Sequence, residues 1–542
     1  MTALPYTTVA RAFRATAATF PEHDFLEVLP ETATAYGIAA GTWTYARALQ
    51  AVDRLVALYA AAGYGHGHRA GLLLLNRPEF LLHFLALNTL GVSAVPINAD
   101  FRAVELEYLI AHSEIALVVA LPSHRQALVA AAQAAGRTLV LVGPEGEGLL
   151  PAEQPIREGE PDLQSECALL YTSGTTAHPK GCLLPNEYFL YAGLWYTTIG
   201  GLCVVRPGVE RMLSPLPLTH MNAMAVSTSC VILSGGCLIL LDRFHPKTWW
   251  ASVRAARATI IHYLGVMPAL LLGAPAAASD REHTVRYGFG AGVNARHHAA
   301  FESRFGFPLL EAWAMTETGS GAVVIANHEP RQVGSACFGR AAAAVECRVV
   351  DDEGQDVLAD APGELWVRHA GPDPQFGFFR GYLKDAAATA AAWADGWFHT
   401  GDLVRRDAAG DFRFVDRKKN IIRRSGENIS AVEVESVLLQ HGAVRSVGIS
   451  AVPDAVRGDE VLAQVVVGEG VAGEVGLARE LVEYVLARLA YYKAPGYIAF
   501  CATLPLTPTE KIQRGVLKTL GHALVSSGQC LDLRAMKKRW DA

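Results

Sequence analysis

The segment from Tyr64 to about Leu121 constrains the fold most, because short apolar runs alternate there with a stretch of helical period. AGLLLL, SAVPI and ALVVAL are typical of buried strands, and PEFLLHFLALNTLG is typical of a helix that ends at Gly91. Strands that are apolar throughout and alternate with helices predict βαβ units around a largely parallel, covered sheet. Similar alternation returns between residues 212 and 264, so we expect a large layered α/β domain.

The length and the later pattern predict a second domain. A chain of 542 residues exceeds the size at which one hydrophobic core keeps growing. Beyond Gly334 short alternating strands and tight turns predict an antiparallel β extension of the first domain. After the charged run 416–420 a new series of helices and strands begins. We therefore predict a large N-terminal domain over residues 1–418 and a small C-terminal α/β domain over residues 419–542.

Charge and cysteine content narrow the class of protein. The formal net charge is −6, with 47 basic and 53 acidic residues, which gives no electrostatic reason to expect a nucleic-acid partner. The nine cysteines form no C-x-x-C pair, which indicates buried thiols in a reducing compartment. We expect no signal peptide, because the N-terminal residues lack a long apolar core, and we see no uninterrupted apolar stretch of membrane-spanning length. We expect a cytoplasmic protein without a membrane span.

The stretch YTSGTTAHPKG, Tyr171 to Gly181, has the composition of a phosphate-binding loop. Gly174 allows the backbone to approach an anion, and Lys180 adds a mobile positive charge. Its hydroxyl donors are Thr172, Ser173, Thr175 and Thr176. It is not a Walker A loop, because Pro179 stands where that motif needs glycine. A polar turn between two strands is the plainer alternative for this segment alone.

Six further segments follow the loop in a recognisable order. They are PLPLTHMNA (215–223), GFGAGV (288–293), EAWAMTETG (311–319), WFHTGDL (397–403), FVDRKKNIIRRSGENIS (414–430) and LPLTPTEKIQRGVLK (504–518). With the loop they resemble the motifs of the adenylate-forming superfamily, which comprises acyl- and aryl-CoA ligases, peptide-synthetase adenylation domains and luciferases. The resemblance covers essentially the whole chain. RRSGENIS is most similar to ligases of the carnitine/crotonobetaine-CoA type.

The resemblance implies a site for ATP and Mg²⁺. The loop 171–181 would be a mobile clamp on the β- and γ-phosphates, with Lys180 as a catalytic residue. Adenine would pack against Gly290, Ala291 and Gly292 and stack on Trp313. Thr316 would meet the α-phosphate, and Glu317 would hold Mg²⁺, because a hard cation prefers oxygen ligands. Asp402 would accept hydrogen bonds from the ribose hydroxyls, and Arg417 would reach the ribose and phosphate.

The resemblance also places the substrate acid, the hinge and the thiol. His220, Gly288 and Ala314 would border the acid pocket. PLPLTHMNA contains no carboxylate to pair with an α-ammonium, which favours an acyl or aryl acid over an amino acid. Lys419 would be the hinge of a mobile C-terminal domain, and Gly426 would let the pantetheine arm of coenzyme A pass.

The last motif would deliver the adenylation lysine, Lys511. A compact ammonium on a long stem can stabilise charge that develops between a carboxylate and a phosphate. The sequence departs from the family pattern at three glycine positions, which here are Ala177, Ala314 and Glu510. A Cβ is costly at the first two if either needs positive φ.

Each motif alone has a plainer interpretation. A lone histidine is often structural, a Thr-Glu pair can sit on a surface turn, and an exposed lysine near a C-terminus is usually inert. The run 416–420 could be a solvated charged segment. A basic tail could meet CoA phosphates, although a solvated tail is the favoured interpretation. Its members are Arg534, Lys537, Lys538 and Arg539.

The combined motifs predict an ATP-dependent carboxylic acid:CoA ligase that forms an acyl-adenylate. The expected partners are a small-molecule carboxylic acid and CoA, and a homodimer is left open. A stand-alone adenylation enzyme that loads a carrier protein is the main alternative. A luciferase-like oxygenase and a nucleotide-binding regulator without turnover are the others.

Overall fold

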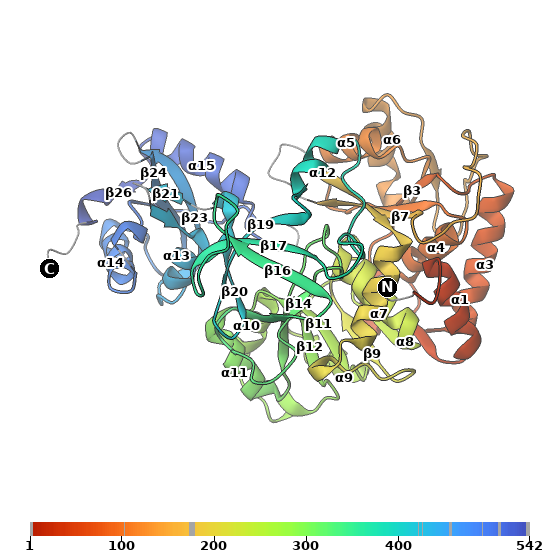
Figure 1. Ribbon diagram of the computed structural model, residues 1–542, viewed down its shortest axis with the longest axis horizontal. Helices are drawn as coiled ribbons and strands as arrows, with labels where there is room; N and C mark the ends of the chain where they lie inside the picture. The colour runs from red at the N-terminus through yellow and green to blue at the C-terminus, as the bar shows by residue number, and fades with distance from the viewer. Residues whose placement is uncertain are drawn as a thin grey trace. The chain divides into compact units, whose positions relative to one another are not determined.

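The computed structural model describes residues 4–101, 103–172, 179–420, 422–424, 427–454, 458–489, 491–507 and 511–537. The chain divides into two compact units. The first joins residues 1–347 to 366–399, and the second joins 348–365 to 400–542. Figure 1 shows both units as mixtures of helices and strands.

The first sheet of the large unit confirms the predicted parallel arrangement. Its strands in spatial order are β6 (Val140–Val142), β5 (Leu117–Ala120), β3 (Arg69–Leu73), β4 (Ser93–Pro96), β7 (Glu166–Thr172) and β8 (Lys180–Pro185). All neighbours are parallel except β7 and β8, which are antiparallel. The predicted helix is α4 (Pro78–Thr89), and Gly91 beyond it has a φ of +75°. Helix α4 is buried on nearly all sides, as a helix between a sheet and other helices must be.

A second, larger sheet completes the core of this unit. The part of this sheet that lies wholly in the large unit has the order β2 (Gly41–Thr44), β1 (Asp24–Val28), β10 (Cys237–Leu240), β9 (Arg211–Ser214), β11 (Ile260–Leu264), β12 (Tyr287–Ala291), β13 (Leu309–Trp313), β14 (Val324–Ile325) and β15 (Cys337–Ala341). The strands from β1 to β13 are parallel, and the outer ones are antiparallel. The carboxyl ends of β12 and β13 therefore meet at one edge.

Helices cover these sheets (Figure 1). They are α1 (Val9–Thr19), α2 (Pro30–Tyr36), α3 (Tyr45–Ala61), α5 (Ala103–Ser113), α6 (Arg125–Ala134), α7 (Asn186–Thr198), α8 (Thr228–Ser234), α9 (Trp249–Ala255), α10 (Val266–Leu272), α11 (Ala295–Phe305) and α12 (Ala386–Ala392). Helices α5 and α6 pack on the first sheet through one apolar cluster, and α9, α10 and α11 pack on the second through another.

The small unit contains an antiparallel part and an α/β part. The first has the order β16 (Val345–Val350), β17 (Pro362–His369), β19 (Trp397–Arg406) and β20 (Phe412–Arg417). Strand β18 (Trp393–Ala394), which pairs with β19, belongs to the large unit. Strands β16, β17 and β19 cross the division between the units. The α/β part has the sheet order β22 (Glu427–Ile429), β21 (Ile422–Arg424), β24 (Gly458–Val467), β25 (Tyr497–Phe500) and β26 (Leu531–Asp532), with β23 (Val444–Asp454) also on β24.

Alternation along β24 explains how the small unit packs. Val461, Ala463 and Val465 join the cluster with α13 (Ala431–Leu438) and α14 (Val475–Leu486), whereas Leu462 faces α15 (Arg514–Ser526). Successive side chains of a strand point to opposite faces, so helices cover the sheet on both sides (Figure 1).

The predicted fold class, a large α/β domain with an antiparallel extension and a small α/β domain, is confirmed. Residues 348–365 and 400–418 belong to the small unit, because hydrogen bonds join these two segments to each other and the Ser430 hydroxyl donates to the Val415 carbonyl. The boundary at residues 418 and 419 and the hinge at Lys419 stay predictions. Among the described helices none is both long and apolar enough to cross a membrane.

Candidate functional site

The predicted phosphate loop connects the antiparallel strands β7 and β8. Thr172 pairs with Lys180 across the two strands, so the ends of the loop are fixed beside each other. The loop residues Ser173, Gly174, Thr175, Thr176 and Ala177 lie outside the described residues. Their phosphate contacts stay a prediction, as does the effect of alanine at position 177.

Lys180 lies beside an aromatic ring and a carboxylate. Its Nζ is 4.6 Å from the ring centroid of Tyr382 and 4.0 Å from Asp385 Oδ2. Backbone pairing explains this position, since Leu383 N–H donates to the Gly181 carbonyl at 2.8 Å. A segment 200 residues further along the chain is thereby aligned with β8.

Glu317 lies on the other side of Tyr382. The Tyr382 hydroxyl donates a hydrogen bond of 2.9 Å to Glu317 Oε1, and Phe379 N–H donates to the Glu317 carbonyl at 3.0 Å. The carboxylate is buried. The adjacent Thr316 is half-buried, and its carbonyl accepts from the Tyr188 hydroxyl at 3.0 Å. The structure therefore brings together the predicted residues Lys180, Thr316 and Glu317.

The end of β13 leads directly into this region. Trp313, the predicted adenine-stacking residue, is the last residue of β13 and packs against Phe338 with ring centroids 6.3 Å apart. Ala314 follows and is exposed. Its φ is not positive, so alanine in place of the family's glycine causes no backbone strain at this position.

The glycines of GFGAGV have two different roles. A Cβ at Gly288 would come within 2.7 Å of Leu309, and one at Gly290 within 2.3 Å of the Tyr263 carbonyl, so these two glycines allow close packing of neighbouring strands. Ala291 and Gly292 are exposed at the end of β12. Gly292 has a φ of +81°. Of the predicted adenine contacts, Ala291 and Gly292 are the ones that face solvent.

Glu311 is a residue of this site that sequence reasoning gave no role. Its Oε2 accepts from Gly292 N–H at 2.9 Å, and its Oε1 accepts from Val293 N–H at 3.1 Å and from the Tyr263 hydroxyl at 2.9 Å. Burial raises the pKa of the Glu311 carboxyl. A glutamate in the apolar strand LLEAW was the available signal, because a buried carboxylate needs partners.

The predicted acid-pocket residue His220 is exposed, and its carbonyl accepts from Met224 N–H at 3.0 Å. It lies two residues before a π-helical segment, Asn222–Ser227. A second histidine, which sequence reasoning missed, contacts this π-helical segment. His262 Nδ1 lies 2.6 Å from Asn222 Oδ1, and its Nε2 lies 3.1 Å from the Tyr196 hydroxyl. Burial lowers the pKa of His262 to about 3, so this residue stays neutral and joins the π-helix to the core.

Asp402 and Arg417 face each other in the small unit. They are paired in register on β19 and β20, and Arg417 Nε lies 2.5 Å from the buried Asp402 carboxylate. Lys418 pairs with Glu364 at 3.0 Å. Asp416 is fully buried and accepts from the Ser430 hydroxyl at 3.0 Å. The interpretation of this run as a solvated charged segment is therefore wrong for Asp416, Arg417 and Lys418, because each of them pairs with another side chain of the fold.

Two predicted residues after this run remain untested. Gly426 lies outside the described residues, and the side chain of Lys419 is likewise not described. Their roles in thiol access and as the hinge stay predictions.

Lys511 is held to Thr507 through its backbone. Thr507 N–H donates to the Lys511 carbonyl at 2.7 Å, and Lys511 N–H donates to Thr507 Oγ1 at 3.0 Å. The residue keeps contact with solvent. Partial desolvation of the ammonium and the positive charge of Arg417 lower its pKa. Glu510 lies outside the described residues.

One member of the basic tail, Lys537, is not solvated as predicted. Lys537 is fully buried with its ammonium on Glu460, which also accepts from Arg424 Nε at 2.9 Å. Arg534 pairs with Asp454 at 2.9 Å. Lys537 therefore cannot reach a CoA phosphate in this arrangement. Lys538 and Arg539 lie outside the described residues.

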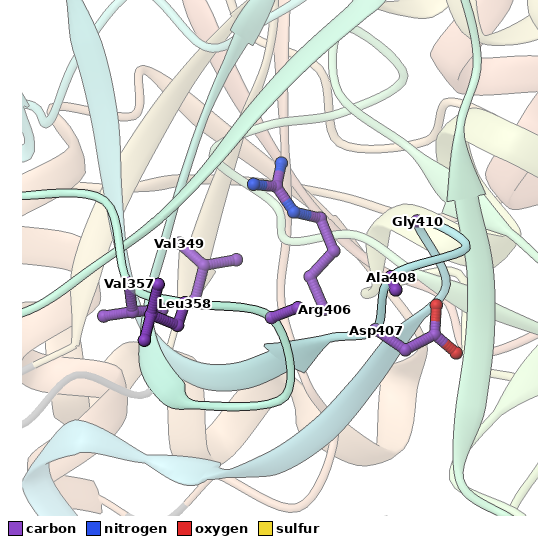
Figure 2. Close-up of a pocket in the computed structure, with 8 residues that line it drawn as sticks. Val349, Val357, Leu358, Arg406, Asp407, Ala408 and Gly410 are labelled. Atoms are coloured by element: carbon purple, nitrogen blue, oxygen red, sulfur yellow. The ribbon is translucent and has the colours of Figure 1, made fainter.

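Other features of the described residues bear on cofactor binding. None of their His, Cys, Asp and Glu side chains form a group of three suited to a metal. The buried Glu317 carboxylate offers oxygen ligands of the kind that Mg²⁺ prefers, and bound phosphates would supply the further ligands. A pocket of about 360 Å³ has Val349, Leu358, Arg406 and Asp407 among its lining residues. Figure 2 shows their side chains. The pocket contains none of the predicted site residues.

Comparisons with known proteins agree with the motif order. The pattern of the AMP-binding enzyme family matches residues 13–383, and that of the AMP-binding enzyme C-terminal domain matches residues 433–511. Crotonobetaine/carnitine–CoA ligases from Shigella flexneri and Escherichia fergusonii are each 29% identical to this chain, over 89% of it and 94% of their own length.

Two solved structures are similar over nearly the whole chain. O-Succinylbenzoate CoA synthetase MenE from Bacillus subtilis, in complex with the acyl-adenylate intermediate OSB-AMP, has a TM-score of 0.80 and 25% identity, over 94% of this chain and 97% of that one. ATP-bound MatB from Rhodopseudomonas palustris has a TM-score of 0.79 and 25% identity, over 94% and 98%. The resemblance predicted from the motifs is confirmed, and this chain belongs to the AMP-binding enzyme family.

Proposed function

We propose that this protein is an ATP-dependent carboxylic acid:CoA ligase that works through an acyl-adenylate. The observation that carries the proposal is the convergence of Lys180 and Glu317 on Tyr382, where a cation and a carboxylate lie at the base of the predicted phosphate loop. Phosphoryl-centre chemistry of this kind depends mainly on positioned charges. The names of the relatives, which are CoA ligases, support the choice of acceptor.

In the first half-reaction a carboxylate oxygen of the acid attacks the α-phosphorus of ATP. The bond from that phosphorus to the bridging oxygen breaks, and pyrophosphate leaves with the electron pair. Lys180 would stabilise the leaving phosphates, and Lys511 would stabilise the charge that develops between carboxylate and α-phosphate. Glu317 would hold Mg²⁺, which neutralises part of the triphosphate charge when bound.

In the second half-reaction the CoA thiolate attacks the acyl carbon, and the bond from that carbon to the phosphate oxygen breaks. A thioester and AMP result. Rotation of the C-terminal domain about Lys419 would withdraw Lys511 and bring the region of Gly426 to the adenylate, a hinge motion of a known kind. His220, Gly288 and Ala314 would border an acyl or aryl acid.

The second candidate is an adenylation enzyme that loads a carrier protein, and it shares the first half-reaction. Pyrophosphate release should be screened over aliphatic, aryl and hydroxy acids, and AMP release should then be followed with CoA or with a holo-carrier protein. We expect acid-dependent pyrophosphate release, with AMP turnover stimulated by CoA. Stimulation only by the carrier would favour the alternative, and no acid-dependent release by any acid would refute adenylate formation.

A further inference from the structure

Tyr382 lies between two charged groups of the site. Its ring faces the Lys180 ammonium at 4.6 Å, and its hydroxyl donates to Glu317 at 2.9 Å. All three residues belong to the large unit. Lys180 comes from β8, Glu317 from the turn after β13, and Tyr382 from the segment before α12. One side chain thus contacts groups from two widely separated parts of the chain.

The fold holds Tyr382 in this position from both sides. The neighbouring Arg380 N–H donates to the Leu183 carbonyl at 2.8 Å, which aligns the segment with β8. Tyr382 N–H donates to Thr389 Oγ1 at 2.9 Å, which fixes the segment to α12. Burial raises the pKa of the Tyr382 hydroxyl, so it remains a neutral donor.

Both contacts leave the charged groups able to bind a ligand. A cation–π contact uses none of the three N–H donors of Lys180. A carboxylate has about four lone-pair positions, and the Tyr382 hydroxyl occupies one of those on Glu317. Asp385, 4.0 Å from Lys180, supplies a charge that a phosphate could replace. This arrangement orients the ammonium and the carboxylate without using all of their hydrogen-bonding positions.

We propose that Tyr382 is a positioning residue that sets Glu317 for the cation and Lys180 for the phosphates of the same nucleotide. The inference rests on the proposed function and adds a residue to it. The hydroxyl acts on the carboxylate, and the ring acts on the ammonium. The two effects can be separated because phenylalanine removes the first and keeps the second.

The test is equilibrium binding of ATP without any acid, in Mg²⁺ and in EDTA. For Tyr382→Phe we expect the Mg²⁺-dependent gain in affinity to fall about 10-fold, as loss of a group that orients a metal ligand typically does, while affinity in EDTA stays unchanged. For Tyr382→Leu we expect weaker binding in EDTA as well. Tyr191→Phe, which alters a buried tyrosine packed on His369 and Phe376, is the matched control.

The binding results distinguish the positioning role of Tyr382 from a folding defect and from failure of the proposed function. Two results for Tyr382→Phe would overturn the positioning role. One is a Mg²⁺-dependent gain in ATP affinity equal to that of the wild type, and the other is an equal loss of ATP affinity with and without Mg²⁺. Melting temperatures of the variants in the absence of ATP separate a folding defect from a binding defect. If Tyr382→Phe binds ATP poorly only because it is unfolded, the positioning role is also overturned. Failure of the wild-type chain to bind ATP would refute the proposed function together with this inference.

Discussion

At the scale of single residues, the site depends on buried polar groups that orient backbone and charge. Glu311 is the clearest case, because its carboxylate accepts two backbone N–H groups at Gly292 and Val293 and one hydroxyl from Tyr263. These bonds hold the turn at the end of β12, where adenine is expected. The side chain does not need to touch the nucleotide to affect how it binds.

Replacing Glu311 with glutamine should weaken ATP binding. The amide NH₂ cannot accept a hydrogen bond, so one backbone N–H would lose its partner at a cost of about 1–3 kcal/mol. We expect the KM for ATP to rise about 10-fold while kcat changes less, measured by pyrophosphate release. The exposed Glu282→Gln is the control. An unchanged KM in the folded variant would contradict the role of Glu311.

At the scale of secondary-structure elements, local patterns predict strands and helices better than they predict contacts. The βαβ alternation around α4 and the antiparallel strands beyond Gly334, such as β19 and β20, follow from apolar period and turn residues, and both are confirmed. The partners of Tyr382 could not be predicted, because they depend on pairing between β8 and a segment about 200 residues away. The burial of Lys537 could not be predicted either, since its carboxylate partner is 77 residues distant.

The segment that carries Lys511 should matter for one half-reaction only. We expect Lys511→Ala to slow acid-dependent pyrophosphate release about 100-fold or more, because it removes a group that stabilises developing charge. Thioester formation from pre-made acyl-adenylate should largely persist. The control is Lys518→Ala, an exposed lysine on α15 in the same motif. Unimpaired adenylation in Lys511→Ala would show that the assignment is wrong.

The buried charge cluster of Arg424, Glu460 and Lys537 should stabilise the small unit. Glu460→Gln removes the buried carboxylate charge that contacts both Arg424 and Lys537, and loss of one partner of a buried ion pair typically costs about 3–5 kcal/mol. Hydrogen exchange of β23 and β25 amides in the full chain measures the opening free energy. Asp532→Asn is the control, since Arg534 keeps Asp454. A change below about 1 kcal/mol, as for a surface pair, would contradict this prediction.

At the scale of the whole molecule, the predicted machinery is divided between two compact units. The large unit carries Lys180, Thr316 and Glu317, and the small unit carries Asp402, Arg417 and Lys511. The predicted boundary at residues 418 and 419 assigns Asp402 and Arg417 to the large domain instead. Motif order finds each of these residues, because each motif is local in sequence. It does not identify the acid, whose recognition depends on side chains gathered from several elements around a pocket.

The central claim is that the acid is activated as an acyl-adenylate, and oxygen transfer tests it most directly. An acid from the screen would be labelled with ¹⁸O in its carboxylate and turned over with ATP and CoA. Attack of that carboxylate on the α-phosphorus followed by thiolysis predicts one ¹⁸O atom in AMP and none in pyrophosphate. Label in inorganic phosphate, with ADP as the nucleotide product, would contradict the adenylate mechanism.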